Sequence, residues 1–157
     1  LPIYNNEEKI AKVVQNYYLS EHLNDDSVAI PYFTDIKASA GNGYINSEDK
    51  TSDFIVLPKS MISGKKLNAI KVYGDSMSPN IKPDSIILID LDKKELKNNT
   101  VFALRYEDEV YVKRIEDHGD TILLKSDNIQ YSTIVTKRNK IFIIGQVVST
   151  ILDKNIE

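Results

Sequence analysis

The sequence predicts a mainly β domain, preceded by a short amphipathic helix and a polar arm. Short runs rich in β-branched residues follow one another after Thr51, separated by turn-forming residues such as "KPD", "HGD" and "SDN". The composition, 41% hydrophobic and 27% charged, is that of an ordinary globular protein. A chain of 157 residues is long enough for one such domain and an arm. No apolar run approaches the roughly 18 residues that a membrane span needs, so no membrane association is expected.

The first fifty residues are predicted to form a helix and then an arm. The apolar residues of the opening stretch recur at the intervals of an amphipathic helix, at Ile10, Val13, Val14 and Tyr17. From residue 24 to residue 52 the sequence is polar and rich in small side chains, which indicates a linker. We therefore predict two parts, an N-terminal helix with an arm over residues 1–50 and a folded domain over residues 51–157.

Seven strands are predicted in the folded domain. In order, they are "DFIVLP", "AIKVYG", "SIILID", "TVFALRY", "EVYVKRIE", "TILLKS" and "KIFIIGQVVSTIL". The fourth and fifth are joined by "ED" alone, which predicts a tight hairpin, and a short helix is expected near "KSMISG". Strands of this length and spacing favour a coiled sheet or a partial barrel.

Charge and composition exclude several classes of function. The net charge is −3 and the isoelectric point about 5.5, which argues against a surface that binds DNA through its phosphates. Without cysteine the chain forms no disulfide and no cysteine metal site. Its two histidines, His22 and His118, are isolated in the sequence and cannot form a zinc site by themselves, and His118, in "EDHGD", is interpreted as a surface residue of a turn. No metal and no cofactor are expected.

One polar turn between two apolar runs is a candidate for chemistry. In "VYGDSMSPNIKPDSIILID", residues 72–90, Ser76 follows a predicted strand. A serine hydroxyl needs a base, and neither histidine stands in a convincing site, so a neutral lysine is the alternative. Lys113 in "EVYVKRIE" shares a strand face with Tyr111 and Ile115. Burial would lower its pKa, although the strand pattern alone favours a lysine whose amine reaches solvent.

Taken together, these features resemble the serine–lysine peptidase domain of LexA, of the lambda-type phage repressors and of UmuD. "YGDSMSP" is followed 37 positions later by the strand lysine of "YVKRI", and the resemblance extends from about residue 36 to residue 148, including "SIILID" and "GQVV". Members of this family cut their own chain between a small residue and glycine, a few dozen residues before the serine. Here "KASAGNG" offers the Ala40–Gly41 bond, 35 positions before Ser76.

The resemblance implies a role for each matching residue. Ser76 would attack the Ala40 carbonyl, and neutral Lys113 would accept the proton of Ser76 and pass it to the Gly41 amine. The backbone N–H groups of Asp75 and Ser76 would bind the oxyanion. This chain departs from the family at Asp75, where an apolar or neutral residue is usual, so we expect its side chain to point to solvent. The implied fold is a LexA C-terminal-like coiled sheet.

The family resemblance also implies a biological setting. It predicts a cytoplasmic homodimer that binds operator DNA through a domain preceding Leu1, and whose cleavage is promoted by the RecA–single-stranded-DNA filament in the DNA-damage (SOS) response. Cleavage would relieve repression. Two alternatives stay open. One is a peptidase-like domain that serves only for dimerisation, and the other is a protease like type I signal peptidase, which shares the serine motif but normally carries a membrane span.

Overall fold

The chain folds into one mixed sheet of nine strands within the residues that the structure, a computed structural model, describes, namely 26–33, 53–62 and 64–151. A short helix and a 3-10 turn accompany the sheet. In chain order the elements are β1 (Ser27–Phe33), β2 (Asp53–Pro58), α2 (Lys59–Ile62), β3 (Leu67–Lys71), β4 (Ile86–Asp90), β5 (Thr100–Tyr106), β6 (Glu109–His118), β7 (Thr121–Lys125), β8 (Ile134–Lys137), η1 (Arg138–Lys140) and β9 (Ile141–Ile151). The prediction of a mainly β fold is confirmed.

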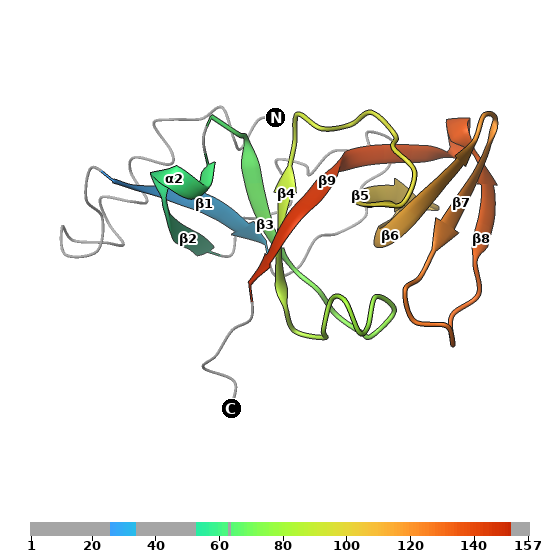
Figure 1. Ribbon diagram of the computed structural model, residues 1–157, viewed down its shortest axis with the longest axis horizontal. Helices are drawn as coiled ribbons and strands as arrows, with labels where there is room; N and C mark the ends of the chain where they lie inside the picture. Colours follow the sequence, from blue (N-terminus) through green and yellow to red (C-terminus); the bar gives the residue numbers. More distant parts are fainter. Residues whose placement is uncertain (1–25, 34–52, 63, 152–157) are drawn as a thin grey trace.

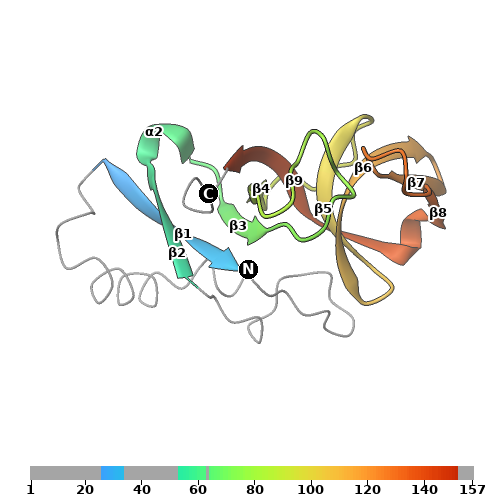
Figure 2. The same ribbon diagram turned by 90° about the horizontal axis from the view of Figure 1, so that it is seen from below.

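The strand order along the sheet is β2-β1-β3-β4-β9-β5-β6-β7-β8. All neighbours are antiparallel except β1 and β3. Figure 1 and Figure 2 place β1, β2 and α2 at one end of the sheet and β6, β7 and β8 at the other. The two ends are joined through β9, whose C-terminal half pairs with β4 and whose N-terminal half pairs with β5.

The seven strands and the short helix predicted from the sequence are all present. In the hairpin between β5 and β6, Glu107 and Asp108 both have positive φ, at 48° and 61°, as in a type I′ turn. Such a turn matches the right-handed twist of the two strands. The second predicted strand is shifted, since β3 ends at Lys71 and the chain leaves the sheet at Val72 for the turn that carries Ser76.

Two strands lie outside the sequence prediction. Strand β1 falls within residues 24–52, so the interpretation of that whole segment as a linker is wrong for Ser27–Phe33. Pro31 obscures the strand, because proline cannot donate a ladder hydrogen bond. It is tolerated here because β3 pairs with β1 only beyond it, at Tyr32 and Phe33. Strand β8 stands at the edge of the sheet and has only four residues, which are too few for an alternation of apolar and polar residues to be recognised.

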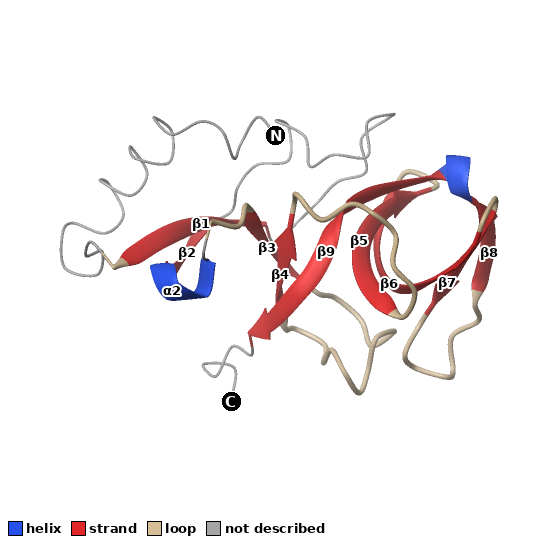
Figure 3. Ribbon diagram, turned by 45° about the horizontal axis from the view of Figure 1, so that its top comes forward, coloured by secondary structure: helices blue, strands red, loops and turns tan. Residues whose placement is uncertain are grey.

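The strongly curled half of the sheet forms one side of the site described below. Figure 3 shows β5, β6, β7 and β9 curving around one another, which agrees with the predicted coiled sheet. Buried side chains fill the curve, namely Phe102, Leu104, Ile115, Ile122, Leu124 and Ile141. A second buried cluster lies where β3, β4 and β9 meet, and it includes Met77 and Ile81 from the loop after β3. The core therefore reaches directly beneath the turn that carries Ser76.

Several sequence predictions lie outside the described residues. These are the N-terminal helix, His22 and the Ala40–Gly41 bond. The division of the chain at residue 50 stays a prediction. In the part of the chain that the structure describes, no helix has the length and hydropathy to span a membrane.

Candidate active site

The turn that carries Ser76 is held rigidly on the core. Two backbone hydrogen bonds close the base of the loop between β3 and β4, from the Val72 N–H to the Ser85 carbonyl at 2.9 Å and from the Asp84 N–H to the Val72 carbonyl at 3.0 Å. Met77, next to Ser76, is 1% exposed and packs in the core. Because its neighbour is fixed in this way, Ser76 is presented from a rigid turn rather than from a mobile loop.

Lys113 is buried on β6. The residue is only 6% exposed, so the expectation from the strand pattern alone, an amine that reaches solvent, is wrong. Burial lowers the pKa of Lys113 below its ordinary value, because the charged amine loses hydration. Ser126 and Tyr131, from the segment after β7, stand against this side chain, which alternation along a single strand cannot reveal.

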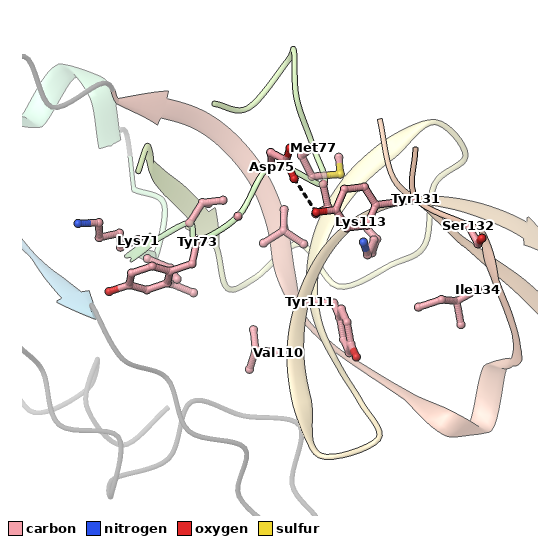
Figure 4. A pocket seen from close by; sticks show the side chains of 15 residues that line it. Lys71, Tyr73, Asp75, Met77, Val110, Tyr111, Lys113, Tyr131, Ser132 and Ile134 are labelled. Atoms are coloured by element: carbon pink, nitrogen blue, oxygen red, sulfur yellow. Dashed lines mark hydrogen bonds between the residues drawn. The ribbon is translucent and has the colours of Figure 1, made fainter. Parts of the chain in front are cut away.

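Ser76 and Lys113 line the same pocket, which has a volume of about 480 Å³. The wall comes from three parts of the chain: the end of β3 and the serine turn, the start of β6, and the segment between β7 and β8. Figure 4 shows the Lys113 side chain beside Tyr131, with Asp75 and Met77 nearby and with Lys71 and Tyr73 farther away. Two residues that are 37 positions apart in the sequence therefore meet at one cavity.

The amine of Lys113 has a hydrogen-bond partner that the sequence motif does not include. Lys113 Nζ donates to Ser126 Oγ over 2.7 Å. Tyrosine rings flank the amine, with its nitrogen 5.8 Å from the ring centroid of Tyr111 and 5.7 Å from that of Tyr131. Among the described contacts, no hydrogen bond joins Lys113 Nζ to Ser76 Oγ.

Asp75 is exposed, as predicted, but its carboxylate is not merely solvated. The Tyr131 hydroxyl donates to Asp75 Oδ1 over 2.5 Å, as the dashed line in Figure 4 marks. This carboxylate raises the pKa of the Tyr131 hydroxyl, since it stabilises the protonated phenol. The carboxylate is thereby held towards Tyr131. Within the described part of the chain, the backbone N–H groups of Asp75 and Ser76 have no acceptor.

Polar contacts tie the segment after β7 to both walls of the pocket. The Asn128 N–H donates to the Ser76 carbonyl at 3.0 Å, and Asn128 Nδ2 donates to the Asp75 carbonyl at 3.1 Å. On the β6 side, Arg114 forms a bidentate pair with Asp127, with both distances at 2.8 Å. Hydrogen bonding to Arg114 holds the pKa of the Asp127 carboxyl below its usual value. This segment therefore joins the serine turn to the lysine strand.

His118 has the surface role that the sequence indicates. It ends β6 next to the turn at Gly119, its side chain is exposed, and its Nε2 lies 2.7 Å from Glu116 Oε1. It does not line the pocket. A histidine base is therefore not available to Ser76 from this position.

A serine on a rigid turn and a buried lysine of lowered pKa at one pocket define a class of site in which an amine can act as a base toward a hydroxyl. The chain belongs to the Peptidase S24-like family, whose model matches residues 31–148. That span contains the whole pocket described above.

Curated relatives agree with this family assignment. The LexA repressor of Mannheimia succiniciproducens is 30% identical over 115 residues, which are 73% of this chain and 53% of that protein. LexA repressor 1 of Nocardia farcinica is 28% identical over 127 residues, which are 81% of this chain and 56% of that protein. The LexA repressor of a Thermotoga species is 28% identical over 120 residues. The chain spans about half the length of the curated relatives it matches.

Proposed function

We propose that this chain is the self-cleaving serine peptidase domain of a LexA-like repressor, with Ser76 as nucleophile and Lys113 as general base. The observation that carries the proposal is that a buried lysine of lowered pKa and a serine on a rigid turn line one pocket. Membership of the Peptidase S24-like family supports it independently. The peptide attacked is the bond between Ala40 and Gly41.

The proposed reaction has two halves. Ser76 Oγ attacks the carbonyl carbon of Ala40, and its proton passes to the neutral amine of Lys113. The bond from Ala40 to the Gly41 nitrogen then breaks, and Lys113 returns the proton to that nitrogen, which leaves as an amine. A water molecule, deprotonated by the same lysine, then attacks the ester carbon of Ala40. The bond from that carbon to Ser76 Oγ breaks, and Lys113 returns the proton to Ser76 Oγ. The lysine ends each half in the neutral form in which it began.

The developing oxyanion is proposed to accept hydrogen bonds from the backbone N–H groups of Asp75 and Ser76. The lack of described acceptors for these groups supports this role. The Asp75 carboxylate would oppose an oxyanion if it faced the same way. Its hydrogen bond to Tyr131 holds it elsewhere, which reconciles an acidic residue at this position with the chemistry.

The relatives, which are named as repressors, support a role in repression. We propose that a DNA-binding domain precedes this chain in the whole protein and that the peptidase domain forms a cytoplasmic homodimer. Cutting at Ala40–Gly41 would separate the two domains. The DNA-binding part would then bind its operator much more weakly, because the avidity of the dimer is lost. A RecA filament on single-stranded DNA is the proposed trigger, in the DNA-damage response.

The position of the cut tests the proposed substrate. Incubation of the purified chain at mildly alkaline pH is expected to give one fragment that ends at Ala40 and another of 117 residues that begins at Gly41. Gly41→Asp should prevent cleavage, because a side chain next to the scissile bond is excluded from a narrow site and aspartate adopts glycine's backbone conformations less readily. Mass spectrometry of the products measures both results.

Asn46→Asp is the matched control for the cut, since it adds the same charge to the arm away from the scissile bond. It should be cleaved at the wild-type rate. A break at Asn42–Gly43 would contradict the assignment of the site but not the serine–lysine chemistry. Cleavage of Gly41→Asp at the normal rate would refute the steric argument.

The rate of cleavage is expected to rise with pH. Burial lowers the pKa of Lys113 in the folded chain, and only the neutral amine can accept the proton of Ser76. The neutral fraction therefore grows as the pH increases through that lowered pKa and then reaches a plateau. The measurement is the first-order rate over roughly pH 6 to 10, a range that lies below the ordinary pKa of lysine, about 10.4, with circular dichroism confirming the fold at each pH. A rate that does not change with pH would exclude lysine as the base.

A further inference from the structure

Ser126 lies in the segment that links the two walls of the pocket, and it contacts the amine directly. We propose that Ser126 is the positioning residue for Lys113, and that its hydroxyl holds the amine in the orientation from which it takes the proton of Ser76. This inference rests on the proposed function and adds a residue to it. In "TILLKSDN", Ser126 follows the last paired residue of β7.

The register of the sheet places the two residues opposite each other. In the hairpin of β6 and β7, Arg114 pairs with Lys125, and the pairing continues down to His118 and Thr121. One step further in the same register brings Ser126 opposite Lys113. Residues opposite each other on antiparallel strands are near neighbours, and Lys113 Nζ lies 2.7 Å from Ser126 Oγ. The contact is therefore built into the hairpin.

A lysine base needs such a contact because its side chain is long. Four rotatable bonds leave a free amine with roughly 2 kcal/mol of rotamer entropy, so it would spend little time in a productive orientation. At Lys113, Ser126 is the one hydrogen-bond partner of the amine among the described residues. The rings of Tyr111 and Tyr131 restrict it from other directions. With one N–H directed to Ser126 Oγ, the lone pair of the neutral amine is limited to the two remaining positions about the nitrogen.

The hydroxyl is itself fixed relative to the serine turn. Asp127, the next residue, forms two hydrogen bonds with Arg114 on β6, and its Oδ2 also accepts one from Asn80 Nδ2 at 2.8 Å. Asn128 is bonded to the carbonyl of Ser76. Ser126 therefore sits on a segment whose following residues are anchored to the strand that carries the base and to the turn that carries the nucleophile, which is the preorganisation that a positioning residue requires.

The same contact affects proton binding. A hydroxyl that accepts a hydrogen bond from an ammonium group stabilises the charged form, so its loss lowers the pKa of the amine. The other titratable groups described near this amine are the phenols of Tyr111 and Tyr131, and Asp75 lies beyond Tyr131. Arg114 is directed to Asp127. None of these groups is altered when only the Ser126 hydroxyl is removed.

The test compares pH–rate profiles of the full chain. We expect Ser126→Ala to lower the plateau rate of self-cleavage roughly tenfold to a hundredfold, the usual cost of a misplaced reacting group. The midpoint of the profile should move to lower pH, because the pKa of Lys113 falls. Ser126→Thr, which keeps the hydroxyl, should restore the rate. Thr133→Ala is the matched control, since it removes an exposed hydroxyl that does not line the pocket, and it should behave as wild type.

A second measurement does not depend on cleavage. In a Ser76→Ala background, NMR titration of the Lys113 side-chain carbon next to the amine should give a lower pKa when Ser126 is also alanine. A wild-type profile for Ser126→Ala, or an unchanged pKa of Lys113, would overturn the inference while leaving the proposed function in place. Failure of the wild-type chain to cut itself would instead contradict the proposed function, and the titration would still decide whether Ser126 holds the amine.

Discussion

Replacing Ser76 by alanine is expected to abolish cleavage of the chain and to leave its fold intact. The hydroxyl is the proposed nucleophile, and loss of a nucleophile lowers a rate by about 10⁴-fold or more. Stability should not change, because no described residue forms a hydrogen bond with this hydroxyl and the turn is anchored by the neighbouring Met77. Gel electrophoresis after alkaline incubation measures cleavage, and thermal unfolding measures stability. Ser78→Ala, which removes a hydroxyl two residues away, should cut normally.

Removal of the proposed base should have an equally large effect. Lys113→Ala is expected to abolish cleavage, and Lys113→Met should do the same while filling the space of the lysine chain. Because a buried amine is desolvated at a cost, Lys113→Met should unfold at a temperature no lower than that of wild type. Cutting at the wild-type rate in Ser76→Ala, Lys113→Ala or Lys113→Met would refute the serine–lysine mechanism.

The second large effect is expected on stability, at Gly145. A Cβ atom on this residue would lie 2.3 Å from the Asp90 carbonyl oxygen, 2.9 Å from its carbonyl carbon and 2.7 Å from Ile89 Cγ2. Two of these three atoms belong to the backbone of β4, which cannot retreat without disturbing its pairing with β9. Gly145→Ala should therefore reach the upper end of the range for overpacking, about 3 kcal/mol. This corresponds to a decrease in Tm of roughly 10 °C or more for a domain of this size.

Gly119→Ala is the contrast for this prediction. Gly119 has a φ of +81°, but a Cβ there would have no atom within 4 Å. Its replacement should cost only backbone strain, about 1 kcal/mol. If thermal unfolding shows that Gly145→Ala loses no more stability than Gly119→Ala, then crowding between β4 and β9 is not what requires glycine at this crossing.

Local sequence patterns were sufficient for most of the sheet. The β5–β6 hairpin needs only its two-residue connection and the β-branched runs on either side, because both the turn and the pairing are contacts between neighbours in the chain. Strand β1 was not predictable in the same way. It carries Pro31, and it is a strand because β2 and β3 pair with it, not because of its own residues. Such pairing is a tertiary property.

The two proposed site residues were found by spacing and family resemblance, but their environment was not. Alternation in β6 favours a Lys113 amine in solvent, whereas the structure buries it. Ser126, Tyr111 and Tyr131 stand against the amine, and two of them, Ser126 and Tyr131, come from the segment after β7. Ser126 carried a weak signal, since extending the β6–β7 hairpin register places it opposite Lys113. A single serine after a strand does not indicate a role at the site until that register is known.

The sequence by itself determined the elements whose causes are local: the predicted strands, the tight hairpin, the serine turn and the identity of a lysine on a strand. Only the tertiary structure decided that Lys113 is desolvated, that Ser76 shares its pocket, and that Ser126 and Tyr131 stand against the amine. The physical reason is that desolvation and hydrogen bonding depend on what surrounds a group. At this site the surroundings of Lys113 come from residues that are 13 to 37 positions away in the chain.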